Sequence, residues 1–148
     1  MASPPKILYR VVSSKFPPFD GTGAQKYGSR WVDPGRLVVH AASAYSLAIL
    51  ENIVHWRTPK LVPSLVCVVA TIPNSVIQET ATVKSIDDQE KCREIGNEWY
   101  DNGDSAVLWV PSVVSPYENN VLINQVHPDF RKIKYNDPVK VIIDKRLL

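Results

Sequence analysis

Cysteine is scarce in this chain, whose 148 residues include only Cys67 and Cys92. Two cysteines exclude a disulfide framework, and Cys67, inside the apolar run 65–70, is expected to be a buried thiol. Long apolar segments are also missing, because no stretch approaches the ~20 residues that a membrane-spanning helix needs. The first residues lack the apolar core of a signal peptide. We therefore expect a soluble, cytoplasmic protein with no membrane contact.

Neither sign of charge dominates the sequence. It has 17 Lys and Arg against 15 Asp and Glu, and a net charge of +2 is too small to predict a nucleic-acid-binding protein. A stripe of basic and aromatic residues, typical of single-strand binding, is missing as well. The charge is unevenly distributed, since residues 1–74 carry 8 basic against 3 acidic side chains and residues 75–148 carry 9 against 12. We therefore expect an anionic ligand to bind groups from the first half.

What is present is typical of one globular domain, with 45% apolar and 22% charged residues. Runs of β-branched and aromatic residues predict strands at residues 7–12, 36–41, 64–71, 106–110, 130–135 and 139–143. Apolar spacing predicts a helix over 44–56 with Ser43 as its N-cap, and a more polar helix over 87–101 that closes at Gly103. The sequence therefore predicts an α+β fold, a single domain over residues 1–148 with a mixed β-sheet and few helices.

The segment 13–35 is a long connection with three prolines, four glycines and four aromatic residues. Loops of this length are usually either functional or disordered. Because its aromatic side chains favour packing, we expect an ordered loop.

Three charged residues occupy unusual places: Arg10 in a predicted strand, Arg30 in the long loop and Glu51 on an apolar helix. A buried charge needs a partner, because desolvation without pairing is costly. One interpretation is a structural ion pair between an arginine and Glu51. The other is a cleft in which two guanidiniums bind a pyrophosphate or carboxylate and Glu51 acts on the ligand. Two arginines stand against one glutamate in the basic half of the chain, which favours the second interpretation, a cleft that binds an anion.

Polar residues also recur between short apolar segments at 110–128. They are Ser112, Glu118, Asn120, Asn124 and His127. Such residues can simply cap turns, but their density directly after a predicted core strand indicates the rim of a pocket. The motifs of phosphate loops, dinucleotide-binding folds, serine hydrolases and zinc sites are missing, so the sequence predicts no metal site.

These features resemble the RES-domain family, which is named for its Arg, Glu and Ser residues. The family forms the toxin half of bacterial Xre–RES toxin–antitoxin pairs. The matching segments appear in the family's order from about residue 7 to the end of the chain, at residues 8–10, 20–24, 28–31, 35–41, 46–51, 110–112, 118–124, 127–128 and 144–147.

The resemblance implies an ADP-ribosyltransferase-like fold whose members bind NAD+ as substrate and break the bond between nicotinamide and ribose. Some members deplete NAD+ by hydrolysis or phosphorolysis, and others transfer the ADP-ribose to a protein. A further implication is a partner, an Xre-type antitoxin with a DNA-binding domain that blocks access to the active site. The acidic stretch 87–104 is either a contact surface for that partner or a solvated face. A catalytically inactive interaction domain is the remaining alternative.

The resemblance also implies Glu51 and Ser112 as catalytic residues and Arg10 and Arg30 as NAD+-binding residues, with His40 matching by position alone. We expect His40 to belong to both sets and Trp31 and Asn120 to complete the NAD+-binding set; the alternative role for Asn120, as for Glu118, is to shape the loop. Glu51 is expected to stabilise the positive charge on the ribose, because the transition state should resemble an oxocarbenium ion. Ser112 would hydrogen-bond the ribose or position Glu51, and no His–Asp pair is apparent that could make it a nucleophile.

His40 stands where most family members have a tyrosine. Its ring is expected to stack on nicotinamide or to orient the ribose. A protonated ring would oppose the cationic nicotinamide, so we expect neutral His40 and an activity that falls below about pH 6.5.

Overall fold

The computed structural model describes residues 3–55 and 64–148. In chain order, its elements are β1 (Lys6–Ser13), α1 (Thr22–Tyr27), β2 (Val38–Ala42), α2 (Tyr45–Ile53), β3 (Leu65–Ile72), β4 (Gln78–Thr80), α3 (Gln89–Asn102), β5 (Val107–Pro111), β6 (Asn119–Asn124), β7 (Lys134–Tyr135) and β8 (Val139–Lys140). Two short 3-10 helices, Pro128–Lys132 and Lys145–Leu147, belong to the C-terminal part. The end of the helix predicted over 44–56 lies outside the described residues.

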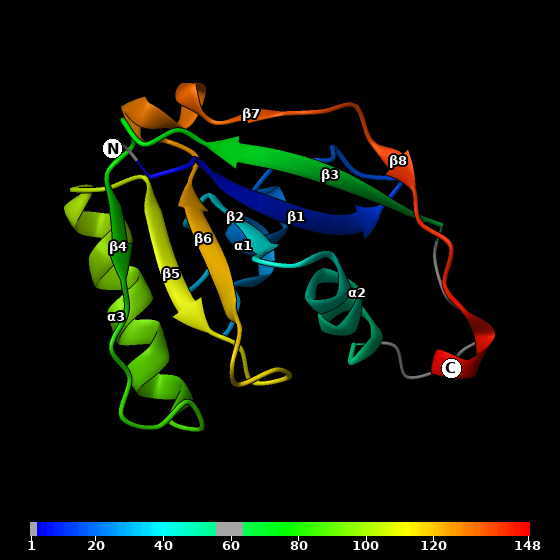
Figure 1. Ribbon diagram of the computed structural model, residues 1–148. Coiled ribbons are helices and arrows are strands. Elements are labelled where there is room, and N and C mark those ends of the chain that lie inside the picture. The colour runs from blue at the N-terminus through cyan, green and yellow to red at the C-terminus, as the bar shows by residue number, and fades with distance from the viewer. Residues whose placement is uncertain (1–2, 56–63) are drawn as a thin grey trace.

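The strands form one mixed sheet in the order β4-β5-β6-β2-β1-β3-β7, and β8 also pairs with β3. In the described part of the chain, β4 and β5 pair in parallel, whereas the other neighbouring strands are antiparallel. Figure 1 shows a twisted sheet with α3 alongside β4 and β5, and with α2 near β1. The predicted α+β fold with a mixed sheet and few helices is confirmed.

Alternation along β2 divides the core and positions the site. Val39 and Ala41 belong to one buried cluster, on the opposite face of the strand from Val38 and Ala42. Val38 packs in the cluster beneath α3, and Ala42 packs in the cluster beneath α2. His40 shares their face of the strand, so its side chain lies between the two helix-covered clusters.

The long connection 13–35 is ordered, as predicted, and contains α1. Two glycines allow it to pack closely against neighbouring backbone. A Cβ atom on Gly21 would lie 2.6 Å from the main-chain nitrogen of Val38. A Cβ atom on Gly96, in α3, would lie 1.8 Å from the carbonyl oxygen of Trp31. The loop that carries the predicted site residues is therefore fixed to both β2 and α3.

Three predicted features are wrong in detail. The strand expected over 130–135 is limited to β7 (Lys134–Tyr135), and its first half belongs to the 3-10 helix Pro128–Lys132, because the His127 ring accepts a hydrogen bond from the main-chain N–H of Asp129 and Pro128 begins the turn. The N-cap of α2 is Ala44, in extended conformation and without a side-chain cap, rather than Ser43. The strand expected over 139–143 is limited to Val139–Lys140.

Besides the C-terminal 3-10 helix Lys145–Leu147, three described elements lie outside the predicted ones: α1, β4 and β6. β6 matters most, because it pairs with both β2 and β5 at the centre of the sheet. Only three consecutive apolar residues, 121–123, mark it in the sequence, and asparagines flank them. These asparagines, interpreted as part of a pocket rim, therefore sit on a strand rather than in a loop.

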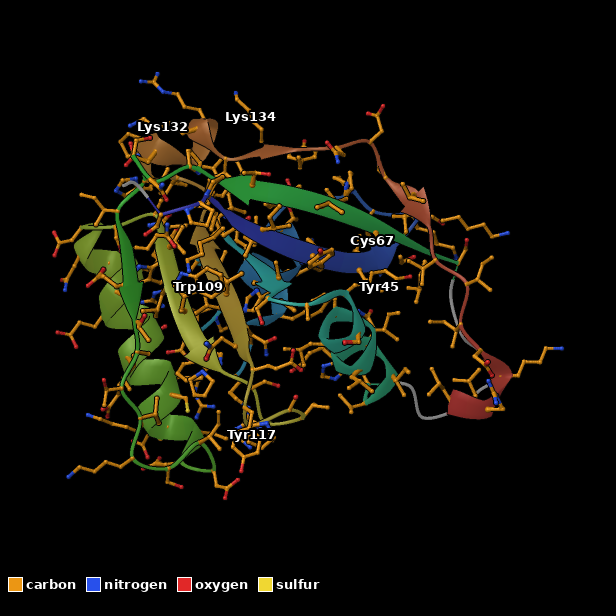
Figure 2. All side chains as sticks on the ribbon, viewed as in Figure 1. Tyr45, Cys67, Trp109, Tyr117, Lys132 and Lys134 are labelled. Carbon is orange, nitrogen blue, oxygen red and sulfur yellow. The ribbon has the colours of Figure 1, made fainter. Side chains whose placement is uncertain are left out.

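Both cysteines are buried free thiols, as expected for Cys67. Figure 2 shows Cys67, which belongs to β3, close to the neighbouring strand β1. Burial raises the pKa of each thiol above its ordinary value. Within residues 3–55 and 64–148, none of the helices is long and apolar enough to cross a membrane.

Candidate active site

A pocket of about 630 Å³ lies on the face of the sheet beside α2. Its walls come from β1, β2, α2, β6, the loop around Ser29 and the loop that follows β5. Six of the seven site residues expected from the sequence line it: Arg10, Arg30, Trp31, His40, Glu51 and Asn120. The seventh, Ser112, is 2% exposed and contacts Glu51 directly. The fold thus brings all seven together from distant parts of the chain.

Glu51 is held by two hydrogen bonds to one of its oxygens. Leu47 and Ala48 bury one face of α2, which places Glu51, one turn after Leu47, at the pocket. Its Oε1 accepts a hydrogen bond from Ser112 Oγ at 2.8 Å and another from Asn120 Nδ2 at 2.8 Å. Both bonds go to Oε1, and within the described part of the chain no hydrogen bond is made to Oε2, which can therefore contact a ligand.

Ser112 is itself oriented by the loop that follows β5. Its Oγ accepts a hydrogen bond from the main-chain N–H of Ser115 at 3.1 Å. The hydroxyl proton is then donated to Glu51. Ser115 Oγ in turn donates to Glu118 at 2.8 Å, so Glu118 shapes this loop without contacting Glu51. Tyr117, fully exposed in the same loop, points away from the sheet (Figure 2).

Arg10 forms hydrogen bonds to three main-chain carbonyl oxygens. Nε donates to Pro18 at 3.1 Å, Nη1 to His40 at 2.7 Å and Nη2 to Asp20 at 3.3 Å. Burial lowers the pKa of this guanidinium to about 10, which still leaves it positively charged at neutral pH. Three of its five N–H groups are used in this way. Arg10 thus attaches the long loop to the sheet and retains donors for an anion.

Arg30 enters the pocket from the loop before Trp31. Its Nη1 donates to the carbonyl oxygen of Ile86 at 3.0 Å. Between the described residues, neither Arg30 nor Arg10 forms an ion pair with Glu51, so the structural Arg–Glu pair considered from the sequence is not what holds these charges. The two cations and the carboxylate instead line the same pocket separately.

Trp31 is 4% exposed and packs in the apolar cluster beneath α3. It lines the pocket as part of this core. Its main chain is also the part of the loop that contacts Gly96. Its position therefore combines support of the loop with a place in the pocket wall.

His40 hydrogen-bonds through Nε2 to Ser29 Oγ at 2.9 Å, and Ser29 Oγ also accepts from the main-chain N–H of Trp31 at 3.2 Å. Burial, together with the positive charge of Arg10, lowers the pKa of His40 to about 4, although the Val38 carbonyl opposes this shift. The ring is therefore neutral at physiological pH. The expected fall in activity below about pH 6.5 needs correction, because His40 remains neutral well below that value.

Ser29 is absent from the residues predicted as functional. In the sequence it is one polar residue among several in a glycine-rich loop. Its distance to His40 depends on the folding of that loop over β2, which no local pattern reveals. Two other residues from the predicted rim play structural parts outside the pocket. The side-chain Oδ1 of Asn124 accepts a hydrogen bond from the main-chain N–H of Val126, and His127 caps a 3-10 helix.

The fold and this site define a class: a small α+β domain with a pocket that combines a clamped glutamate with two separate arginines. A family model described as "RES domain" matches residues 7–144. The chain belongs to the RES-domain family.

Similar proteins of nearly the same length are toxins. One is "Toxin Res" from Photorhabdus laumondii, 39% identical over 153 residues that cover 96% of this chain and 97% of that protein. Another is the "Prs ADP-ribosylating toxin" from Sphingobium, 35% identical over 137 residues, 86% of this chain and 85% of that protein. The chain is accordingly a toxin of the RES type.

A solved structure resembles the fold. The M. tuberculosis MbcT–MbcA toxin–antitoxin complex contains a chain that matches with a TM-score of 0.73. The match covers 93% of this chain and 84% of that chain at 12% sequence identity. At this identity the likeness shows the shared fold alone.

Proposed function

We propose that this toxin binds NAD+ and cleaves the bond between nicotinamide and ribose, depleting NAD+ by hydrolysis or phosphorolysis. The observation that carries the proposal is the Glu51 carboxylate, clamped on one oxygen by Ser112 and Asn120 in a pocket that also contains Arg10 and Arg30. A carboxylate fixed in this way is suited to a developing positive charge, because it needs no reorganisation during the reaction.

The size and charge of the pocket support a dinucleotide ligand. Its volume of about 630 Å³ is within the usual range of small-molecule sites. Arg10 and Arg30 keep N–H donors beyond those bound to carbonyl oxygens, and guanidinium groups bind phosphate oxygens well. Asn120 adds a buried carbonyl oxygen without a partner among the described residues. These groups suit a ligand that has both anionic and hydrogen-bond-donating parts.

Each side chain then has a distinct task in the proposed reaction. Arg10 and Arg30 bind the diphosphate. Glu51 faces the ribose and stabilises the positive charge that grows as the bond to nicotinamide breaks. Ser112 acts through Glu51, because its hydroxyl proton is donated to that carboxylate. His40, held neutral, adds no positive charge near the nicotinamide cation.

Transfer of ADP-ribose to a protein is the second candidate function. It is supported by the similar Sphingobium protein that is named as an ADP-ribosylating toxin. Both functions begin with the same bond cleavage and use the same pocket. They differ in the acceptor, which is water or phosphate in one and a protein side chain in the other.

We also propose an Xre-type DNA-binding antitoxin as the partner of this chain. An NAD+-consuming enzyme would damage its own host unless a partner blocked the pocket. Support comes from the structural neighbour, which was solved as a toxin–antitoxin complex. Around the pocket, Val54 and Val113 are 55% and 41% exposed, which gives a partner apolar surface to cover.

The test is induction of the toxin in bacteria without antitoxin, followed by measurement of growth, intracellular NAD+ and protein masses. The wild-type chain should stop growth and lower NAD+, and Glu51→Gln should do neither. Glu98→Gln, which makes the same change on the exposed face of α3, is the matched control and should behave as wild type. A mass gain of one ADP-ribose on a protein with constant NAD+ would favour transfer over depletion. Growth with unchanged NAD+ and unchanged masses would favour the inactive interaction domain.

A further inference from the structure

Asn120 has a fixed place between the walls of the pocket. It lies on β6, opposite Ala42 of β2 on one side and Val110 of β5 on the other. Residues directly opposite each other in antiparallel strands share a face of the sheet. Asn120 therefore faces α2 and Glu51, on a central strand whose backbone is held from both sides.

The orientation of its amide follows from the contacts of Glu51 Oε1. Asn120 Nδ2 lies 2.8 Å from Glu51 Oε1, and Ser112 donates to the same oxygen. An amide turned by 180° would place its carbonyl oxygen against the carboxylate, and two acceptors would then face each other. Since Oε1 already accepts the Ser112 proton, it has no proton to offer to a second acceptor, and that arrangement is excluded. The carbonyl oxygen Oδ1 must therefore face away from Glu51.

Asn120 Oδ1 is buried and accepts no hydrogen bond from the residues that the structure describes. Most buried side-chain oxygens have a partner, because an unpaired one costs the full desolvation of the group. Asn120 also lines the pocket. A ligand with an O–H or N–H group at this place would satisfy the oxygen.

We propose that Asn120 recognises the ligand directly. Its amide N–H donates a hydrogen bond to Glu51, while its Oδ1 accepts a hydrogen bond from a donor group of bound NAD+. This inference rests on the proposed function, since it takes NAD+ as the ligand. Two groups next to the scissile bond can donate, the 2′-hydroxyl of the ribose and the carboxamide of nicotinamide. Asn120 thereby couples recognition of substrate to the orientation of the carboxylate that acts on it.

This contact would make the enzyme select between NAD+ and its analogues, which a purely structural asparagine would not do. An acceptor aimed into a pocket rejects analogues that lack the matching donor, because the oxygen is then left unpaired. Two NAD+ analogues separate the two donors. In 2′-deoxy-NAD+ the ribose hydroxyl is missing, whereas in nicotinic acid adenine dinucleotide a carboxylate replaces the carboxamide.

The experiment compares kcat/KM for NAD+ and both analogues in wild type, Asn120→Ala and Asn119→Ala. Asn119 is the matched control, because it is the neighbouring, exposed asparagine of β6 and does not line the pocket. Wild type and Asn119→Ala should disfavour one analogue, and Asn120→Ala should reduce that preference by about three- to tenfold. The comparison divides the preference of the variant for NAD+ over an analogue by the same preference of wild type, so intrinsic differences in reactivity between the dinucleotides cancel.

Binding gives a second readout that does not depend on turnover. Calorimetry with carba-NAD+, which cannot be cleaved, should show a weaker Kd for Asn120→Ala by about three- to tenfold and no change for Asn119→Ala. Thermal unfolding of each variant confirms that it is folded, and Asn120→Ser replaces Asn120→Ala if the latter is not. Preferences and Kd values that are equal in the Asn120 variant and wild type would overturn the inference alone. A wild-type chain that neither binds carba-NAD+ nor cleaves NAD+ would overturn the proposed function, and the inference with it.

Discussion

A change of pH from 7 to 5 should destabilise this protein through His40, whose ring is neutral because of its surroundings. Burial and the nearby Arg10 guanidinium lower its pKa from 6.5 to about 4. Between these two values the unfolded chain binds a proton that the folded chain does not. The free energy of unfolding therefore falls as the pH drops from 6.5 to 4, and is constant with respect to this group below that range.

The expected loss is about 3 kcal/mol over the whole range and about 2 kcal/mol between pH 7 and pH 5. Urea unfolding at these two pH values measures it, in wild type and in His40→Gln. Glutamine does not titrate but keeps an amide within reach of Ser29. Wild type should lose about 2 kcal/mol more than the variant, because the other titrating groups contribute equally to both.

The same pKa has a consequence for activity. In protein shown to be folded, NAD+ cleavage should not decline through loss of neutral His40 until the pH approaches 4. An equal loss of stability in wild type and His40→Gln between pH 7 and pH 5 would refute the reasoning. It would mean that the folded ring takes up a proton as readily as the unfolded one.

Three further predictions concern packing and the site. Gly96→Ala should lower the free energy of unfolding by roughly 3 kcal/mol or more, because the new Cβ would overlap the main-chain carbonyl of Trp31. The loss should be visible as a large fall in Tm, and an unchanged Tm would contradict this close approach. Ser112→Ala should lower kcat by about ten- to hundredfold while the fold is retained, since Glu51 loses a donor; full activity would remove Ser112 from the site. Arg10→Met should cost about 3 kcal/mol of stability and Arg30→Met about 1 kcal/mol, because methionine donates none of the hydrogen bonds to carbonyl oxygens, three from Arg10 and one from Arg30. Denaturant titration measures both losses, and equal losses would contradict the difference.

The sequence predicted much of the fold where the pattern was long and regular. β1 and β3 were marked by runs of β-branched residues and α2 and α3 by apolar spacing, and each is present within a few residues of its predicted bounds. β6 was hidden because only three apolar residues mark it, although pairing with two neighbours makes it a central strand. The strand expected at 130–135 is shortened to β7 (Lys134–Tyr135), since a His127 cap and a proline start a helical turn over its first half.

For the site, the sequence indicated which residues meet but not how they interact. Charges in apolar surroundings pointed to Arg10, Arg30 and Glu51, and all three line one pocket. Their partners were not predictable, because main-chain carbonyl oxygens bind Arg10 and these leave no trace in the residue pattern. The contact of Ser29 with His40 likewise depends on loop packing over the sheet.

The central claim is tested most directly by nicotinamide release from NAD+ with purified protein, measured by chromatography for wild type, Glu51→Gln and the control Glu98→Gln. The account predicts release by wild type and by Glu98→Gln, with a loss of at least about a hundredfold in Glu51→Gln at unchanged Tm. Release by Glu51→Gln at the wild-type rate would contradict the account, as would a folded wild-type protein that releases no nicotinamide at all.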